Sequence, residues 1–185
     1  SPDESPVTRW REKKYEESFR IPGKWRELEQ PLPKPLGPWQ FRADPLEKGV
    51  EEKWYKADID TGDWSEITVP AMWNEFPEWK GYEGQGWYRA DFQLPADWKG
   101  KGLELLFGSV DEEAWIYVNG EQVGERSTAS TGKSANELWE APFKVTVSPK
   151  CLRYGKTNSL VIRVYNSKAG GGIWRPVLAH AVEVD

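Results

Sequence analysis

The stretch 111–124, DEEAWIYVNGEQVG, has the pattern of a β-hairpin. Small and aliphatic residues alternate with aromatic ones over 114–118, which is the two-residue period of a strand with two distinct faces. Asn119-Gly120 follows, and this pair most readily takes positive φ at both central positions of a type I′ turn. We therefore predict that Asn119 serves the turn rather than a ligand. The turn should close one end of a sheet.

Composition limits the classes of protein to consider. The chain has 185 residues, which suits one domain with a sizeable core. Its formal net charge is −5 with acidic and basic residues interspersed, so we expect neither a nucleic-acid partner nor a membrane partner. Cys151 is the only cysteine, which excludes an internal disulfide and a cysteine-based metal cluster within one chain. The single His180 excludes any mechanism that needs two histidines, and we expect it to be packed in the last strand.

Residues 1–38 form a polar, proline-rich segment ahead of the domain. The run 31–35, PLPKP, should be extended and stiff. Because the segment carries Trp10 and Trp25, we predict a strap that lies over the domain. A linker to a neighbouring domain is the alternative.

Residues 39–185 are predicted to form one all-β domain. Strand-like segments recur at short spacing without a convincing amphipathic helix, over 39–42, 64–70, 87–94, 103–107, 114–118, 121–124, 143–147, 160–165 and 177–184. This pattern is typical of an antiparallel β-sandwich. Successive strands alternate in direction, so every second connection lies at the same end. Counting from Asn119-Gly120 places the loops 70–86, 108–112, 125–142 and 166–176 together at the opposite end.

Five segments together resemble a known family. They are VPAMW (69–73), GWYRADFQLPADWKGKGLELLFGSVDEEAWIYVNGEQVG (86–124), APFKVTV (141–147), NSLVIRVYN (158–166) and GGIWRPV (171–177). In this order they resemble the sugar-binding jelly-roll domain at the N-terminus of glycoside hydrolase family 2 enzymes, which has the galactose-binding-domain-like fold. The resemblance covers about Trp39 to Val184. The 125–142 loop is longer than in many members, and the first 38 residues have no counterpart.

The resemblance implies sugar recognition without catalysis by this chain. It also implies an adjacent catalytic domain in a longer parent protein, and we expect an extracellular or periplasmic location. The same fold occurs in independent carbohydrate-binding modules. The loops named above contain what a sugar needs, because pyranose C–H faces pack on aromatic rings and hydroxyls bind planar polar groups. The candidate ligand-binding residues are Trp79, Tyr82, Asn136, Trp139, Asn166, Trp174 and Arg175.

The tryptophans are expected to divide between binding and packing. Trp79 and Trp139 lie outside the matching segments, which favours ligand binding, whereas Trp174 lies inside one. Trp87 and Trp115 fall within predicted strands and are expected in the core. Two tryptophans near Pro70, Trp64 and Trp73, are expected at the edge of the core.

No catalytic residue is predicted. Glycosidase chemistry needs two carboxyl groups facing each other across a cleft at ~5 to 9.5 Å. The adjacent pair Asp111-Glu112 does not provide this by sequence alone, so we expect Asp111 to hold the loop before the hairpin. We predict no cofactor and no metal. A calcium ion is common in the wider fold, but the sequence has no Asp/Asn/Gly run of ligand spacing to support one.

Two functions from different classes follow. The first is a non-catalytic carbohydrate-binding module that recognises a polysaccharide or oligosaccharide through loops at one end of the sandwich. The alternative is an accessory domain that shapes the active site of a neighbouring catalytic domain. A protein-interaction module is a third class.

Overall fold

The structure, a computed structural model, describes residues 36–183 of the chain. Its strands are β1 (Trp39–Asp44), β2 (Ser65–Ile67), β3 (Gly84–Gln93), β4 (Gly102–Phe107), β5 (Val110–Asp111), β6 (Glu113–Val118), β7 (Glu121–Arg126), β8 (Phe143–Val147), β9 (Thr157–Asn166), β10 (Gly172–Ile173) and β11 (Val177–Val182). Its helices are all short: η1 (Trp73–Glu75), η2 (Pro77–Trp79), η3 (Ala96–Trp98), α3 (Thr128–Thr131), α4 (Ala135–Leu138) and η4 (Pro149–Cys151). The predicted strap or linker lies outside the described residues except for 36–38.

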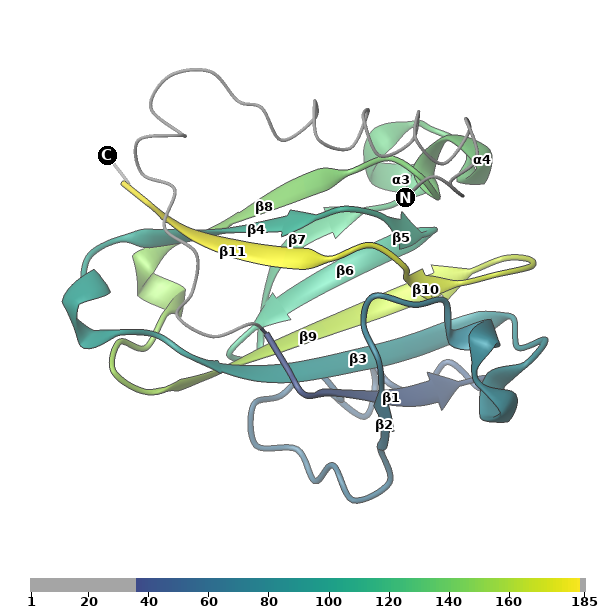
Figure 1. Ribbon diagram of the computed structural model, residues 1–185, viewed down its shortest axis with the longest axis horizontal. Helices are drawn as coiled ribbons and strands as arrows, with labels where there is room; N and C mark the ends of the chain where they lie inside the picture. Colours follow the sequence, from purple (N-terminus) through teal and green to yellow (C-terminus); the bar gives the residue numbers. More distant parts are fainter. Residues whose placement is uncertain (1–35, 184–185) are drawn as a thin grey trace, which may run out of the picture.

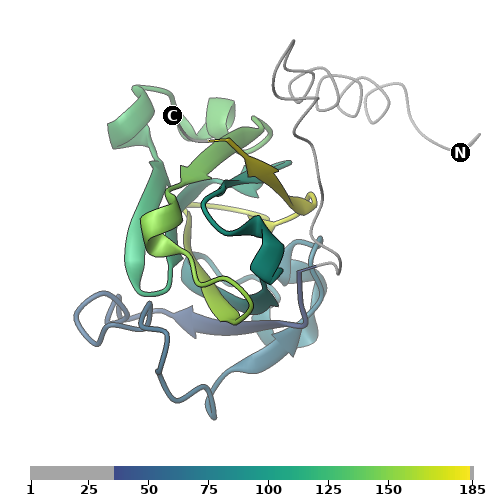
Figure 2. The same ribbon diagram turned by 90° about the vertical axis from the view of Figure 1, so that its left-hand side faces the viewer.

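Two sheets pack face to face, as Figures 1 and 2 show. The large sheet has six strands in the order β2-β1-β3-β9-β6-β7, and the small sheet has three in the order β11-β4-β8. A two-stranded ladder, β10-β5, lies at one end. Every pairing in these sheets is antiparallel. The predicted antiparallel β-sandwich is therefore confirmed.

The β6–β7 hairpin has the predicted turn. Asn119 and Gly120 have φ values of 51° and 85°, so both central positions are in the left-handed region that a type I′ turn requires. The Asn119 side chain also fixes its surroundings. Its Nδ2 donates to the Cys151 carbonyl (2.7 Å), and its Oδ1 accepts from the Ser159 backbone N–H (2.9 Å). Asn119 is thus a turn residue, as the sequence indicates.

The main core lies between the two sheets. In β6, Ala114, Ile116 and Val118 are fully buried and face this core. Leu103, Leu105 and Phe107 of β4 meet them from the small sheet. The Trp73 side chain joins the same cluster and is 0% exposed, so it lies inside the core rather than at its edge.

A second hydrophobic cluster lies on the outer face of the large sheet. It consists of Trp54, Trp64, Trp87, Tyr117 and Val161. The segment 45–63 folds over this face and supplies Trp54, whose ring lies 5.9 Å from that of Trp87. A Cβ built on Gly49 would come within 2.4 Å of the Trp87 ring, so glycine permits the close approach. Trp87 is buried as predicted, but in this second cluster.

The prediction for Trp115 is wrong. It alternates with the core residues of β6 and therefore points to the outer face, where it is half-buried. Its ring packs against the guanidinium of Arg163, with Cζ 3.8 Å from the ring centroid. The two-residue period that places Ile116 in the core necessarily places its neighbour outside it.

The two ends of the sandwich differ as strand counting predicts. The Asn119 backbone N–H donates to the Ser159 carbonyl (3.0 Å) near the start of β9, whereas Gly84 pairs with Asn166 where β9 ends. We call the Asn119-Gly120 end the turn end. The opposite end, with loops 70–86, 108–112, 125–142 and 166–176, is the loop end, on the right in Figure 1 beyond β5 and β10.

Candidate functional site

Backbone hydrogen bonds join two of the long loops at the loop end. The Trp73 N–H donates to the Gly171 carbonyl (2.9 Å), and the Ala71 N–H donates to the Ile173 carbonyl (3.0 Å). In return, the Gly171 N–H donates to Oδ1 of Asn74 (2.8 Å). Loops 70–86 and 166–176 therefore form one connected surface.

Trp139 and Trp174 come together from different loops. Their rings stack with centroids 5.4 Å apart and planes 25° apart. The Trp174 Nε1–H donates to the Trp139 carbonyl (2.8 Å), which fixes the pair. Arg175 lies over the Trp174 ring, with Cζ 4.7 Å from the centroid. Both indoles are half-buried, so they form an aromatic surface at the loop end, adjacent to a cation.

Trp79 and Tyr82 serve mainly to pack loop 70–86. The Trp79 ring meets Phe41 of β1 edge-on at 4.7 Å and Phe76 at 5.9 Å. The Tyr82 hydroxyl donates to the Gln85 carbonyl (2.5 Å). Burial raises the pKa of Tyr82 to about 12, so its proton stays in that bond. Both side chains are half-buried, but each is already engaged within the domain.

The two predicted asparagines have different positions. Asn166 is fully buried, its Nδ2 donates to the Ala169 carbonyl (2.9 Å), and its Oδ1 accepts from the Lys168 N–H (3.3 Å). Its side chain thus holds loop 166–176 in shape, and its burial does not support a sugar contact. Asn136 is exposed on α4, three residues before Trp139, and can reach solvent.

Arg126 ties together the backbone beneath this surface, and its role is not apparent from sequence. One guanidinium nitrogen donates to the Ala141 carbonyl (2.6 Å), and the other donates to the carbonyls of Val110 (2.6 Å) and Glu112 (2.8 Å). Its Cζ lies 4.5 Å above the Phe143 ring. Burial lowers the pKa of Arg126 to about 10, although nearby carboxylates oppose that shift, so it stays a cation at neutral pH.

Asp111 is the second residue whose role the sequence did not reveal. It is 8% exposed and sits in the β5-β10 ladder opposite Gly172, two residues before Trp174. Within the described part of the chain, no side chain or backbone N–H donates a hydrogen bond to its carboxylate. Burial and the charge of Glu112 raise the pKa of Asp111 to about 7, while Arg126 opposes the shift. The carboxyl group is therefore partly desolvated, has no donor among the described residues and is open to solvent at the loop end.

The carboxylate of Glu112, the neighbour of Asp111, already accepts a hydrogen bond within the domain. Its Oε1 accepts a hydrogen bond from the Ser167 N–H (3.0 Å), which attaches loop 166–176 to the 108–112 connection. The adjacent carboxyls thus have different surroundings, one bonded to a loop and one without a donor among residues 36–183.

The described residues contain no group of three or more His, Cys, Asp or Glu side chains that could hold a metal ion. Likewise, none of the helices within 36–183 is long and apolar enough to cross a membrane.

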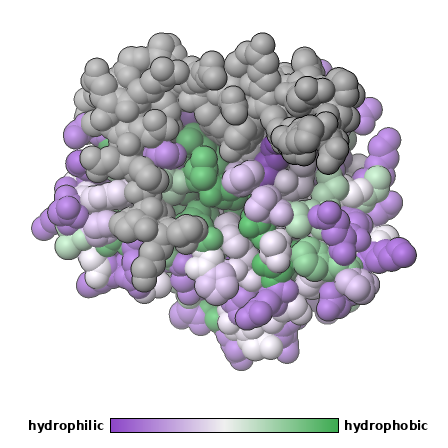
Figure 3. All heavy atoms as spheres, viewed as in Figure 1, coloured by the Kyte–Doolittle hydropathy of each residue, from purple (hydrophilic) through white to green (hydrophobic). Residues whose placement is uncertain are grey.

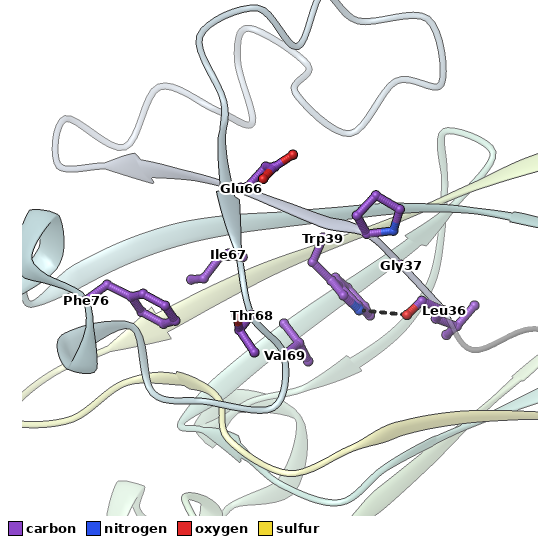
Figure 4. A pocket seen from close by; sticks show the side chains of 9 residues that line it. Leu36, Gly37, Trp39, Glu66, Ile67, Thr68, Val69 and Phe76 are labelled. Atoms are coloured by element: carbon purple, nitrogen blue, oxygen red, sulfur yellow. Dashed lines mark hydrogen bonds between the residues drawn. The ribbon is translucent and has the colours of Figure 1, made fainter.

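A groove of about 480 Å³ lies beside strands β1 and β2, next to Phe76 of loop 70–86. Figure 4 shows Trp39 on one side of it, with its Nε1–H bonded to the Leu36 carbonyl (3.2 Å), and Phe76 on another. None of the seven predicted sugar contacts lines this groove. The sequence-predicted residues and the groove are therefore separate features.

The sequence matches the family described as glycosyl hydrolases family 2, sugar binding domain, over residues 32–177. The chain belongs to this family. The resemblance seen in the sequence is thereby confirmed, and the sandwich is a sugar-binding domain of glycoside hydrolases.

Known relatives of this sugar-binding domain are longer proteins. A β-glucuronidase of Paenibacillus borealis is 34% identical over 90 residues, which cover 47% of this chain and 15% of that protein. A β-glucuronidase of Formosa agariphila is 26% identical over 159 residues, covering 68% of this chain and 15% of that protein. The chain thus spans well under two thirds of the curated relatives that it matches.

Solved structures share the fold. A β-glucuronidase from Ruminococcus gnavus in complex with D-glucuronic acid superposes with a TM-score of 0.67 at 22% identity. The match covers 83% of this chain and 29% of that one. A glycosyl hydrolase family 2 member from Bacteroides cellulosilyticus gives a TM-score of 0.64 at 23% identity, over 84% of this chain and 21% of that one.

Proposed function

We propose that the loop end of this domain forms one wall of a sugar-binding active site whose catalytic groups belong to a neighbouring domain. The observation that carries the proposal is the Asp111 carboxyl group, which reaches the surface at the loop end and has no hydrogen-bond donor among residues 36–183. A partly desolvated carboxylate without protein donors is stabilised by a ligand or partner that supplies them. Sugar hydroxyls are donors of that kind, and charge-assisted hydrogen bonds to them are strong.

The aromatic pair complements this carboxyl group. Trp139 and Trp174 offer apolar ring surface for the C–H face of a pyranose, and the exposed Asn136 amide can both donate and accept. Arg126 holds the backbone on both sides of Asp111 and keeps the carboxyl in a fixed position. Together they make a small, rigid polar and aromatic surface, suited to part of one sugar unit.

A shared site fits this geometry better than an independent module does. Of the predicted contacts, Tyr82, Asn166 and the Trp174 indole N–H already bond within the domain. Few of the predicted polar groups then remain to bind a polysaccharide along its length. The β-glucuronidases and β-galactosidases that the chain resembles are named for single terminal sugars, and the domain covers 10–15% of them. An adjacent catalytic domain and an extracellular or periplasmic location belong to the same proposal.

The test uses the full-length product of the gene and p-nitrophenyl β-D-glucuronide and β-D-galactoside as substrates. Asp111→Asn and Trp139→Ala should each lower kcat/KM about 10-fold or more, the scale of losing a charged hydrogen bond or a packed ring. Asp97→Asn, an exposed substitution in η3, is the control and should leave kcat/KM unchanged. Thermal melting of each variant separates lost contact from lost fold.

The competing function, an independent carbohydrate-binding module, predicts a different experimental result. An independent module would retard on polysaccharide affinity gels as the isolated chain 1–185, and it would lose that retardation with Trp139→Ala. Retardation of this kind, with kcat/KM of the full-length variants unchanged, would replace the proposal by the carbohydrate-binding module.

A further inference from the structure

The small sheet has an outer surface whose side chains point away from the core. In β4, Leu103 and Leu105 belong to the main core, so Glu104 and Leu106 face outward. In β11 the core residues are Ala179 and Ala181. The outward residues pair across these strands as Leu106 with Leu178 and Glu104 with His180, followed on β11 by Val182.

The part of this outer surface over β4 and β11 is mostly buried. Leu106 is 2% exposed, His180 6% and Val182 8%, whereas Leu178, at 42%, and the outward Lys144 and Thr146 of β8 are open to solvent. The β8 edge is thus polar, as a face toward water commonly is, but the β4 and β11 part carries covered apolar side chains. Leu106 and Val182 belong to neither hydrophobic cluster that the described residues form.

Leu138 extends this surface toward the loop end. It is 0% exposed on α4, yet it too belongs to neither cluster within 36–183. Figure 1 places α4 near β8 at the loop end, and Figure 3 shows hydrophobic side chains gathered at the centre of the molecule in the same view. Buried apolar side chains thus run from the small sheet to the helix that precedes Trp139.

We propose that residues 1–35 bind this outer surface of the same chain as a strap. Apart from residues 184–185, no other part of the chain lies outside the described range. Residues 184–185 are too few to cover Val182, Leu106 and Leu138 together. The 35 residues can span up to roughly 115 Å, whereas six-residue strands such as β4 and β11 extend only about 20 Å.

The composition of the segment fits an apolar surface. It carries the aromatic side chains Trp10, Tyr15, Phe19 and Trp25, each of which can bury a large area. The same segment is rich in charge of both signs, which suits an outer face toward water. A second copy of the chain or a neighbouring domain would be the other occupants, and the experiment separates all three.

Paramagnetic relaxation in the whole chain tests the strap. With Cys151→Ser to remove the native thiol, a spin label on Leu178→Cys should broaden amide signals from residues 1–35. The control label on Glu66→Cys, an exposed position on the edge strand of the other sheet, should leave the signals of residues 10–25 sharp and broaden only those next to Leu36, which lines the same groove as Glu66. A 1:1 mixture of isotope-labelled chain and spin-labelled unlabelled chain reports contacts between copies.

Each outcome identifies one of the three possible occupants of the surface. Broadening of residues 10–25 within one chain by the label at 178, but not by that at 66, supports the strap. Broadening in the mixture shows a second copy instead, and unaffected signals in both samples show a linker that leaves the surface to a neighbouring domain.

A second measurement does not depend on the label. Replacing Trp10, Phe19 and Trp25 by Ser together should lower the melting midpoint by several degrees. Replacing Ser5, Thr8 and Ser18 by Ala is the matched control and should not. Equal midpoints for the two variants would overturn the strap.

Discussion

At the scale of single residues, Asp111 stands out because its neighbours satisfy its backbone and not its carboxyl group. Arg126 lies close enough to attract the charge, but its guanidinium donates to the carbonyls of Val110, Glu112 and Ala141 instead. Glu112 repels the charge from the other side. The ionised form of Asp111 is therefore disfavoured in the folded chain unless a ligand or partner provides donors.

A pH dependence of stability follows for Asp111. Its folded pKa of about 7 lies above the usual value, so its contribution is fully present below pH ~4 and is lost as pH rises to about 7. Asp111→Asn should remove this loss and raise the free energy of unfolding at pH 8 relative to the wild type by on the order of 1 to 2 kcal/mol, because solvent screens the exposed part of the carboxyl group. Urea unfolding of the wild type and of Asp111→Asn at pH 5 and at pH 8 measures the free energy of unfolding of each and its change with pH.

The control for this prediction is Asp97→Asn, an exposed carboxyl group in η3 near the turn end. It should leave the difference between pH 5 and pH 8 unchanged. Equal pH profiles for wild type and Asp111→Asn would mean that Asp111 finds its donors elsewhere.

Sequence reasoning predicted which loops share one end of the sandwich, but not the geometry of the candidate site there. Strand counting brought Trp139 and Trp174 to one end, because direction alternates regardless of detail. It could not show that the two rings stack, since that depends on loop backbones with no periodicity. Asp111 was assigned a structural role because hydrogen-bond donors cannot be counted from sequence. Arg126 was missed because its partners are carbonyls, which carry no residue identity.

At the scale of elements, one row of side chains runs across neighbouring strands on the outer face of the large sheet. Strand register places Trp115, Arg163, Trp87 and Arg42 side by side on four neighbouring strands, β6, β9, β3 and β1. Cations and aromatic rings alternate along the row, with Arg42 also lying 3.9 Å above Trp54. The segment 45–63 covers the Trp87 side of the row and leaves Trp115 half-exposed.

The two tryptophans of this row should respond differently to truncation. Trp87→Ala should cost about 3 to 5 kcal/mol, because the ring is fully buried and its Nε1–H bonds to Asp44 (3.0 Å). Trp115→Ala should cost about 1 to 2 kcal/mol, mostly from the lost contact with Arg163. Chemical denaturation of both variants measures the difference. Equal costs would show that segment 45–63 adds nothing to the burial of Trp87.

Long elements were predicted well and short ones were not. The central strands β3 and β9 carry clear alternation, and sequence placed them within a few residues of their bounds. The two-residue strands β5 and β10 were missed, because so few residues show no period. The four-residue helices α3 and α4 were assigned to a loop for the same reason. Both begin with a capping box, at Ser127 and at Ser134. The Ser134–Glu137 spacing is a helix-start pattern present in the sequence, which the prediction overlooked.

At the scale of the whole molecule, the turn end and the loop end of the sandwich differ in structure and in proposed role. The turn end is closed by Asn119-Gly120 and its hydrogen bonds, whereas the loop end carries the candidate site. No step of hydrolysis is assigned to this chain, because the free carboxyl Asp111 and the bonded Glu112 are adjacent rather than opposed across a cleft.

We therefore expect chain 1–185 alone to release no p-nitrophenol from p-nitrophenyl β-D-glucuronide or β-D-galactoside above the buffer rate. A trace of contaminating enzyme is recognised because Asp111→Asn and Glu112→Gln would leave its rate unchanged. Activity that survives repurification and falls in either variant would contradict the expectation.

The position of Cys151 gives the molecule a built-in orientation for surface chemistry. It is the single thiol of the chain, and its carbonyl is bonded to Asn119 at the turn end. A sensor chip or bead coupled through this sulfur would hold every copy with its loops facing the solution. The hydrogen bond with Glu121 raises the pKa of the thiol, as does its partial burial, so maleimide coupling should speed up as the buffer is made more alkaline. Immobilised in this way, the domain would present its aromatic pair uniformly to any glycan passed over it.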